Sequence, residues 1–456
     1  MVEFEREYET VFAGQVCVEA VETGIEAVSP KEVVEKKMEF DGDSMCIEGS
    51  DLSLEVSRFE RVLVVGGGKG SSVLAREIVE RLGGVDGGVV VDSDPVGIEG
   101  VETVEGSHPV PDETSVEGAT KVVETAREAD EDDLVVFVVT GGGSSLMTAP
   151  ADGIQLKDLR RTNRLLLESG ASIDEINSVR KHLSEIKGGR LARELDLART
   201  VSVIVSDVVG DDTSVIASGP TSPDASTYSD AVKTLREYGI YDECPDAVVR
   251  RLTQGVEGEW DETPSYGDIC FEKVDNVVVA NTFDAVDAAR EYVENHGYET
   301  VVLSSLTEGE SRDVGEFHAS VLRECVRTGN PAEPPCAVIS GGETTVEVTG
   351  DGDGGPNQEF VLSCLLSLYE SGVGELNEDE GEVEVGIAAV DTDGIDGVGG
   401  AAGAVGSTET IDDPEKAAVA LEENSSYTFF DERDGLVVTG ETSTNVSDLR
   451  VMVIRP

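Results

Sequence analysis

The chain has 456 residues, and its 94 acidic residues outnumber 34 basic ones, which gives a formal net charge of -60 at pH 7. This charge argues against nucleic acid or an anionic membrane as a partner, because both would repel the protein. The hydrophobic content of 39% is enough for a sizeable core and more than one domain. We therefore expect a folded protein with a carboxylate-coated surface, as in halophilic cytoplasm, where salt screens the self-repulsion.

The cysteines and the apolar runs indicate the compartment. The seven cysteines are scattered and contain no C-x-x-C pair, which argues against a zinc site or a disulfide framework and for a reducing compartment. The opening residues, MVEFEREYET, are acidic and unlike a signal peptide. No apolar run approaches the roughly 18 residues that a membrane span needs. We expect a soluble, cytoplasmic protein.

Short apolar strands alternate with helices in the first part of the chain. The sequence predicts strands at 61–65, 87–92, 134–140 and 201–207. It predicts helices that end near Leu82, that run from Thr114 to Ala129, and that fill the region from Leu156 to Leu195. Continuous apolar strands separated by helices are typical of a mostly parallel sheet with helices on both faces.

The alternation is interrupted once and then resumes. The segment VEGEWDETPSYGD (256–268) is polar and rich in turn residues, and we expect it to be a linker. Beyond it the sequence predicts the strands VDNVVVA, ETVVLSS and CAVIS, a hairpin at ETTVEVTGDGDGG, a helix from Asn357, and the strand VEVGIAAV. We therefore predict two α/β domains, residues 1–262 and residues 263–456.

The first candidate site is the glycine loop in VLVVGGGKGSS. A strand, a glycine turn and a helix leave helix N-terminal amides free for a phosphate, with Gly67, Gly68, Lys69 and Ser71 as candidate contacts. The spacing matches neither a Walker A loop nor a complete G-x-G-x-x-G motif. Asp92 ends the second strand, where a dinucleotide-binding protein would hold ribose, so a dehydrogenase remains an alternative. Alternatively, the loop is only a tight turn, and its lysine is exposed to solvent and binds no ligand.

A second glycine loop follows the third strand, in VVFVVTGGGSSLMTAP (135–150). Like the first loop, it consists of a predicted strand followed by glycines and serines. A parallel sheet can present both loops at the carboxyl ends of its strands. The candidate contacts to an anion are Gly141, Gly142, Gly143, Ser144 and Ser145. The serines could instead cap the next helix.

A cluster of cations stands out in this acidic chain, in NSVRKHLSEIKGGRLAREL from Asn177. Arg180 offers a planar fork for a carboxylate or phosphate, and Lys181 offers a point charge. The other cations of the cluster are His182, Lys187 and Arg190. Salt bridges to local acids such as Glu185 are the alternative.

Carboxylates follow two predicted strands. Asp207 closes the strand 201–207, and Asp211 comes one tight turn later. Such groups can hold magnesium beside substrate phosphates or accept a hydroxyl proton. Asp393 and Asp396 lie in AAVDTDGIDG, whose spacing fails the EF-hand pattern. Surface placement is the alternative for each carboxylate.

The second domain offers polar groups beside glycine turns. SGGETTVEV contains Glu343, and GGPNQEF starts a predicted helix with Asn357 and Gln358. These residues could contact a ligand with amides and side chains, and helix capping by Asn357 is the alternative.

These motifs together resemble the class II glycerate kinases, the MOFRL-type glycerate 2-kinases. The blocks GGGKGSS, GSHPVPDETS, TGGGSSLMTAP, SDVVGDD, GGETTV, GGPNQEF, DGIDG and GETSTNVSDL follow the family's order over nearly the whole chain. The resemblance implies a Rossmann-like first domain, a smaller mixed α/β MOFRL domain, and an active site in the cleft between them. It also implies ATP- and magnesium-dependent phosphorylation of D-glycerate to 2-phosphoglycerate.

The hypothesis that follows assigns a role to each candidate. Lys69 and the glycine loops would hold phosphate, Arg180 would bind the glycerate carboxylate, and Lys181 would lie near the transferred phosphoryl group. Asp207 would hold magnesium directly or through water, with Asp211, Asp393 and Asp396 as further metal ligands. An aspartate of the 207–212 or 391–396 group would accept the hydroxyl proton. An NAD(P)H-dependent hydroxypyruvate reductase is the alternative function. The sequence leaves open whether the enzyme forms a homodimer.

Two positions depart from the pattern that the resemblance implies. Pro356 stands where the family commonly has arginine, and Gly400 stands where it commonly has aspartate. If the arginine contacts phosphate in relatives, Lys69, Arg180 or Lys181 must supply that charge here.

Overall fold

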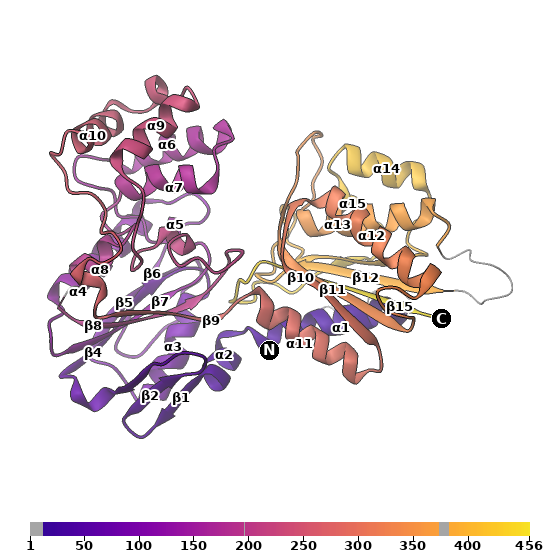
Figure 1. Ribbon diagram of the computed structural model, residues 1–456, viewed down its shortest axis with the longest axis horizontal. Helices are drawn as coiled ribbons and strands as arrows, with labels where there is room; N and C mark the ends of the chain where they lie inside the picture. Colours follow the sequence, from indigo (N-terminus) through magenta and orange to yellow (C-terminus); the bar gives the residue numbers. More distant parts are fainter. Residues whose placement is uncertain (1–11, 196, 374–382) are drawn as a thin grey trace. The chain divides into compact units, whose positions relative to one another are not determined.

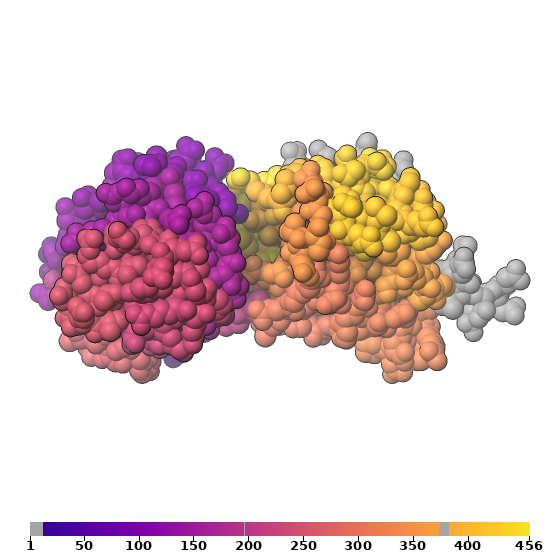
Figure 2. Space-filling model, turned by 90° about the horizontal axis from the view of Figure 1, so that it is seen from above, coloured from indigo at the N-terminus to yellow at the C-terminus, as the bar shows by residue number. Residues whose placement is uncertain are grey.

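The computed structural model describes residues 12–195, 197–373 and 383–456, and the acidic opening stretch MVEFEREYET lies outside these ranges. The chain divides into two compact units. Unit 1 contains the chain up to Glu32, Asp207–Gly210 and Ala280–Pro456, and unit 2 contains Val33–Ser206 and Asp211–Val279. In the space-filling view the atoms of each unit form one continuous body (Figure 2).

Unit 2 is built on a six-stranded sheet (Figure 1). Its strand order is β6 (Glu102–Glu105), β5 (Gly87–Asp92), β4 (Arg61–Gly67), β7 (Asp133–Val139), β8 (Arg199–Val205) and β9 (Val274–Ala280). The pairs from β6 to β8 are parallel. Every residue of β7 is buried, as expected for a central strand covered on both faces. The predicted parallel sheet is confirmed.

The helices of unit 2 fall into two groups. The helices α3 (Ser71–Leu82) and α4 (Glu113–Glu128) pack against the sheet, and α5 (Gly143–Leu146) and α8 (Arg190–Glu194) contact α4. A second group packs into a core of its own and consists of α6 (Leu156–Ser169), α7 (Ile173–His182), α9 (Tyr228–Glu237) and α10 (Asp246–Val256) (Figure 1). The predicted helical region 156–195 is thus three helices. Gly170, with a left-handed backbone, ends α6, and the Ser172 side chain caps α7.

Unit 1 is built on a mixed six-stranded sheet. Its strand order is β10 (Glu299–Glu310), β11 (Cys336–Thr345), β15 (Asp448–Arg455), β12 (Glu384–Asp391), β13 (Gly403–Ser407) and β14 (Leu436–Val437). Only β10 and β11 pair in parallel among these neighbours. On one face lie α1 (Phe12–Ala27) and α11 (Thr282–Asn295); on the other lie α12 (Ser311–Thr328), α13 (Pro356–Glu370), α14 (Pro414–Glu422) and α15 (Ser426–Asp431) (Figure 1).

The compact units do not follow the predicted boundary at residue 262. Strand β9 joins the sheet of unit 2 although it follows the predicted linker 256–268. Helix α1 belongs to unit 1, because its apolar face packs on β12 and β15 from the far end of the chain. Contacts between such distant segments leave no local signal in the sequence.

Two further segments differ from expectation or were not predicted. After β11 the predicted hairpin is replaced by irregular chain that leads to α13. Before β4 lie α2 (Pro30–Lys37) and a small antiparallel sheet of β1 (Met38–Asp41), β2 (Ser44–Ile47) and β3 (Ser53–Glu55). In the part of the chain that the structure describes, no helix has the length and apolar character needed to cross a membrane.

Candidate functional site

The two glycine loops of unit 2 lie against each other. The backbone N–H of Lys69 donates to the Gly141 carbonyl at 2.8 Å, and Thr140 Oγ1 donates to the Lys69 carbonyl at 2.8 Å. A Cβ on Gly68, whose φ is +143°, would stand 2.1 Å from Thr140 Oγ1. The glycines are therefore needed for the close approach of the two loops. As predicted, the sheet presents both loops at the same edge.

The start of α3 is already occupied by a carboxylate. The two oxygens of Asp92 accept from the backbone N–H groups of Gly70 at 3.0 Å and Ser72 at 2.9 Å, and from Ser72 Oγ at 2.7 Å. Ser71 is buried, and its hydroxyl donates to the Val91 carbonyl at 3.2 Å. The predicted phosphate contact of these amides and of Ser71 is thus corrected. Asp92 is buried as a helix cap, so it does not present its carboxylate to a ribose.

The second glycine loop is tied to the cationic cluster through Ser144. Lys187 Nζ donates to Ser144 Oγ at 2.7 Å and to the Ser144 carbonyl at 2.6 Å. Ser144 Oγ also lies 2.9 Å from Ser218 Oγ, which in turn donates to Asn177 Oδ1 at 3.2 Å. These contacts bring together residues that the sequence singled out separately, Ser144, Asn177 and Lys187.

Ser218, which contacts Ser144 and Asn177, has a strained backbone conformation. Ala217 and Ser218 have φ values of 49° and 62°, in the left-handed region that residues with a side chain rarely adopt. Such strain costs of the order of 1–3 kcal/mol per residue and clusters at functional sites. The motif IASGPT, which contains both residues, therefore marks a position where backbone geometry is constrained by the site.

A cavity of about 580 Å³ opens beside Ser144 in unit 2. Arg180 and Lys187 line it, together with Ser145 and apolar side chains of α6 and the loop before α4. Arg180 Nε donates to Asn163 Oδ1 at 3.1 Å. Ser145 Oγ donates to the Pro109 carbonyl at 2.8 Å.

Arg180 and Lys187 have no compensating carboxylate in the part of the chain that the structure describes. Among the described residues, no carboxylate forms an ion pair with Arg180 or Lys187. Burial, and then the neighbouring guanidinium of Arg180, lower the pKa of Lys187 to about 7. Burial also lowers the pKa of Arg180. An anion in the cavity would be attracted to both groups.

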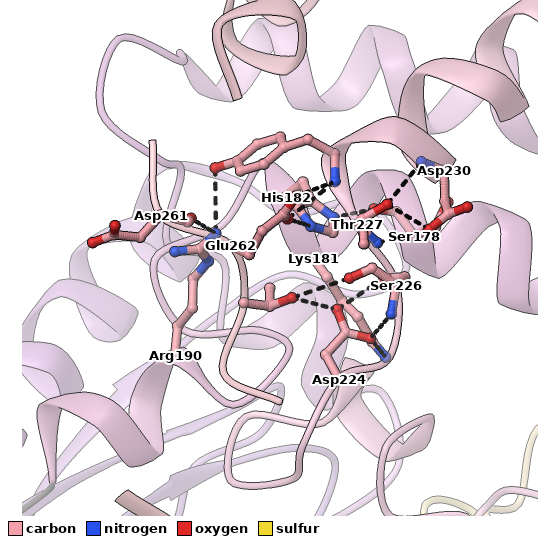
Figure 3. A network of polar contacts seen from close by, with 12 residues as sticks. Ser178, Lys181, His182, Arg190, Asp224, Ser226, Thr227, Asp230, Asp261 and Glu262 are labelled. Atoms are coloured by element: carbon pink, nitrogen blue, oxygen red, sulfur yellow. Dashed lines mark hydrogen bonds and ion pairs between the residues drawn. The ribbon is translucent and has the colours of Figure 1, made fainter. Parts of the chain in front are cut away.

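The rest of the cationic cluster forms a structural network (Figure 3). Lys181 Nζ donates to Asp224 Oδ1 at 3.0 Å, and both side chains are buried. His182 contacts the Ser178 carbonyl and the carboxylate of Glu262. The contact of Lys181 with the transferred phosphoryl group stays a prediction, and the pairing with a buried carboxylate favours a structural role for this lysine.

The third cation of this network is Arg190, which contacts Asp261, the residue before Glu262. Its guanidinium donates to Tyr228 Oη at 3.3 Å and to the Asp261 carbonyl at 3.2 Å (Figure 3). Salt bridges to local acids were the expected alternative for the cluster. In the structure, Lys181, His182 and Arg190 form contacts within the protein, whereas Arg180 and Lys187 line the cavity.

In unit 1, Asp396 caps α13. Its carboxylate accepts from the backbone N–H groups of Asn357 at 3.0 Å and Gln358 at 2.9 Å. Burial raises the pKa of Asp396 to about 7. The buried Asn357 Oδ1 and Gln358 Oε1 have no hydrogen-bond partner among the described residues. The proposal that these two side chains contact a ligand gains support from this pair of acceptors.

Carboxylates gather beside this helix start. Asp448 accepts from Asn357 Nδ2 at 2.7 Å and from the Thr344 N–H at 3.1 Å, and Arg450 also donates to it. Desolvation by the surrounding chain and the carboxylates of Asp207, Asp448 and Glu308 raise the pKa of Glu343 to about 7. Asp448 and Arg450 were not predicted, although Asp448 lies in the quoted block GETSTNVSDL.

The predicted metal ligands do not form one group. Among the described residues, no three His, Cys, Asp or Glu side chains are arranged to hold a metal ion. Asp396 is engaged as a helix cap, and Asp393 Oδ1 accepts from the Ile395 N–H at 2.8 Å within its own turn. Asp396 therefore does not fit as a metal ligand. Asp211, with a φ of 58°, follows Asp207 after a tight turn.

Comparison with known proteins identifies the chain's relatives. A family model described as a domain of unknown function (DUF4147) matches residues 16–253, and the MOFRL family model matches residues 336–448. A glycerate 2-kinase from Pyrococcus horikoshii is 34% identical over 94% of each chain. The chain belongs to the MOFRL-type glycerate 2-kinase family.

Two further relatives of this glycerate 2-kinase family member bear on its fold and activity. The crystal structure of a glycerate kinase from Thermotoga maritima matches with a TM-score of 0.80 at 35% identity, over 97% of this chain and 99% of that one. A protein from Agrobacterium vitis whose name gives hydroxypyruvate reductase as its proposed activity is 38% identical, over 86% of this chain and 99% of the Agrobacterium chain.

The two departures from the glycerate 2-kinase pattern have a local structural account. Pro356 is the first residue of α13, a position that lacks an intrahelical partner for its N–H and therefore suits proline. Gly400 has a φ of +80°, and a Cβ there would meet nothing within 4 Å. Neither position brings a charged side chain to the sites described above.

Proposed function

We propose that the chain transfers the γ-phosphoryl group of ATP to D-glycerate, with 2-phosphoglycerate as the product. The observation that carries this proposal is a pair of cations, the half-buried Arg180 and the buried Lys187, that line a cavity and have no carboxylate partner among the described residues. Phosphoryl transfer needs positioning and neutralisation of negative charge, with little covalent work by the protein. Arg180 supplies that neutralisation, and so does Lys187 once a bound phosphate favours its protonated form, in a molecule of net charge -60.

Lys69 would add a third charge at the glycine loops. Its backbone is held by Gly141 and Thr140, which positions the residue where the two loops meet. Removing a charge-stabilising group typically lowers turnover about 10²- to 10³-fold. We expect Lys69→Ala to lose activity by this factor with an unchanged thermal midpoint. Near-normal turnover of the variant would remove Lys69 from the catalytic set.

The proton of the attacking hydroxyl requires an acceptor. We propose Glu343 for this role, with the neighbouring Asp207 as the alternative. A general base works best when its pKa lies near the working pH, and the pKa of Glu343 is raised to about 7 by desolvation and by nearby carboxylates. Asn357 and Gln358 would hold a ligand next to it through their unpaired oxygens.

Magnesium remains part of the proposal through the nucleotide. An Mg²⁺ ion on substrate phosphates commonly takes only one or two protein carboxylates and keeps several waters. Asp207 would be such a ligand, with Asp211 as the alternative, and the ion would neutralise charge on the phosphate oxygens. A group of three carboxylates, which the described residues lack, is then not needed.

One assay separates the kinase from the reductase. The purified chain, in molar KCl with magnesium, is given D-glycerate with ATP in one reaction and hydroxypyruvate with NADH or NADPH in another. The kinase predicts ADP release that depends on glycerate, and no loss of NADH absorbance. Loss of NADH absorbance without glycerate-dependent ADP would overturn the proposal. The engagement of Asp92 as a helix cap disfavours the reductase.

A further inference from the structure

The cavity of unit 2 combines two kinds of lining. Helix α6 contributes two adjacent stripes with the four-residue spacing that places side chains on one helix face. Leu159, Asn163 and Leu167 lie on one stripe, and Arg160 and Arg164 lie on the other. Val110, from the loop before α4, extends the apolar part. The side chains of Val110 and Leu167 are 57% and 64% exposed, so neither is covered by the protein's own core.

The polar part of the lining includes Ser144, Arg180 and Lys187, and one carboxylate, that of Glu168, also lines the cavity. Burying cations without a partner is unfavourable, and two that lie close together repel each other. In this molecule acidic residues are plentiful, yet no described carboxylate pairs with Arg180 or Lys187. The arrangement is therefore one that a bound polyanion would stabilise.

The size and the apolar stripe together identify the ligand class. A volume of about 580 Å³ falls within the range of roughly 300–1,000 Å³ that holds ligands of drug size. D-Glycerate has three carbons, each carrying oxygen, and would leave the exposed Leu167 and the exposed part of Leu159 facing water. A nucleoside triphosphate has a planar base that can lie on apolar side chains and a polyphosphate that can bind the cations.

We propose that this cavity is the nucleotide site of the enzyme, with the base against Leu167, Leu159 and Val110 and the polyphosphate on Arg180 and Lys187. The inference rests on the proposed kinase function and assigns its nucleotide to unit 2. It changes the role expected for Arg180 from binding the glycerate carboxylate to binding phosphate. Glycerate then binds at other residues.

The test uses the full-length chain in molar KCl and measures two quantities for each variant. One is the Kd for ATP from an equilibrium titration without glycerate, and the other is the pair of KM values for ATP and D-glycerate. The variants are Arg180→Gln, Leu167→Asp and Val110→Asp. The control is Leu197→Asp, which alters an exposed leucine (57%) of the same unit outside the cavity.

Arg180→Gln removes charge-assisted contacts to phosphate, so we expect the Kd and KM for ATP to rise about 10- to 100-fold. Leu167→Asp and Val110→Asp remove apolar contact and add a repelling charge, so each should weaken ATP at least about tenfold. The KM for glycerate should stay within about twofold in the two aspartate variants, and the control should match the wild type in every value. Two positions are tested so that misfolding of one variant does not decide the result.

The outcomes distinguish the nucleotide site from the kinase function. Unchanged ATP affinity in both aspartate variants, or a rise confined to the KM for glycerate, would overturn the nucleotide site and leave the kinase standing. ATP binding that the variants weaken, in a protein that forms no ADP with glycerate, would support the site and overturn the proposed function.

Discussion

Lys187 Nζ donates a hydrogen bond to Ser144 Oγ at 2.7 Å and joins two segments that lie 43 residues apart. The same nitrogen donates to the Ser144 carbonyl at 2.6 Å. The Lys187 amine is thus buried among neutral oxygens, and the guanidinium of Arg180 also lowers its pKa. Protonation of the amine is therefore less favourable than in water, and this change can be measured in the absence of any substrate.

The first prediction concerns stability at alkaline pH. The folded pKa of Lys187 is about 7, whereas an unfolded lysine has a pKa of about 10.4. Between these values the unfolded chain binds more protons, so the free energy of unfolding contributed by Lys187 rises with pH, by about 2 kcal/mol from pH 7 to pH 9. Lys187→Met should lack this rise, as measured by denaturant unfolding across that range.

The other charged groups that line the same cavity are Arg160, Arg164, Glu168 and Arg180, and all of them are kept in the Lys187 variant. Lys121→Met is the matched control, because Lys121 is a surface lysine paired with Glu117 and Glu102. This control should keep the wild-type dependence on pH. Equal slopes for Lys187→Met and the wild type would contradict an uncharged Lys187 above pH 7.

The second prediction separates a structural lysine from a catalytic one. Lys181→Met leaves the buried carboxylate of Asp224 unpaired, which should lower the free energy of unfolding by about 3–5 kcal/mol. The ion pair and the hydrogen bonds from Ser226 hold the pKa of Asp224 low against the burial that alone would raise it. The double variant Lys181→Met/Asp224→Leu should recover most of the stability. Turnover of the double variant near the wild-type value checks the structural role, and a loss of about 10²-fold or more would return Lys181 to the catalytic set.

The third prediction concerns the proton acceptor. Glu343 has a pKa raised to about 7, so it is protonated and inactive as a base at lower pH. The value of kcat/KM for glycerate should therefore rise as the pH increases to about 7 and then level off. Glu343→Gln should lower kcat about 10²- to 10⁴-fold and remove this rise. Glu343→Asp should keep a displaced rise. Asp396 also titrates near 7, and a full acid limb in Glu343→Gln would point to that group instead.

The fourth prediction tests the cap of α3. Asp92 accepts three hydrogen bonds at the start of this helix. Asp92→Ala leaves those donors unpaired and should cost about 1–3 kcal/mol of unfolding free energy, measured by denaturant titration. Asp92→Asn keeps an acceptor oxygen and should cost less. An alanine variant as stable as the wild type would show that the carboxylate has a purpose other than capping.

Several features could be predicted from local sequence because local physics decides them. Apolar runs bounded by glycine predict strands β4, β5, β7 and β8, since only buried parallel strands are apolar on both faces. The glycine triplets predict where backbones approach closely. The long motif blocks carry the family resemblance over nearly the whole chain.

Other features depend on partners that are distant in the sequence. Helix α1 packs against strands more than 300 residues away, so no local pattern predicts that it joins unit 1. Asp92 and Asp396 read as ligand carboxylates, yet each faces the N-terminus of a helix from another segment. In the sequence, an aspartate that is free to bind a ligand cannot be distinguished from one that caps a helix.

The amino-acid sequence by itself determined the fold class, the two glycine loops and the concentration of rare cations in one segment, because periodicity, backbone freedom and charge are properties of neighbouring residues. Only the tertiary structure decided which cation has a partner. Lys181 and Lys187 are six positions apart, but packing places Asp224 against the first, whereas the hydrogen-bond acceptors of the second within the described ranges are the neutral oxygens of Ser144. The charge of a lysine is available to a ligand only when the fold places no carboxylate beside it, and tertiary packing alone decides that.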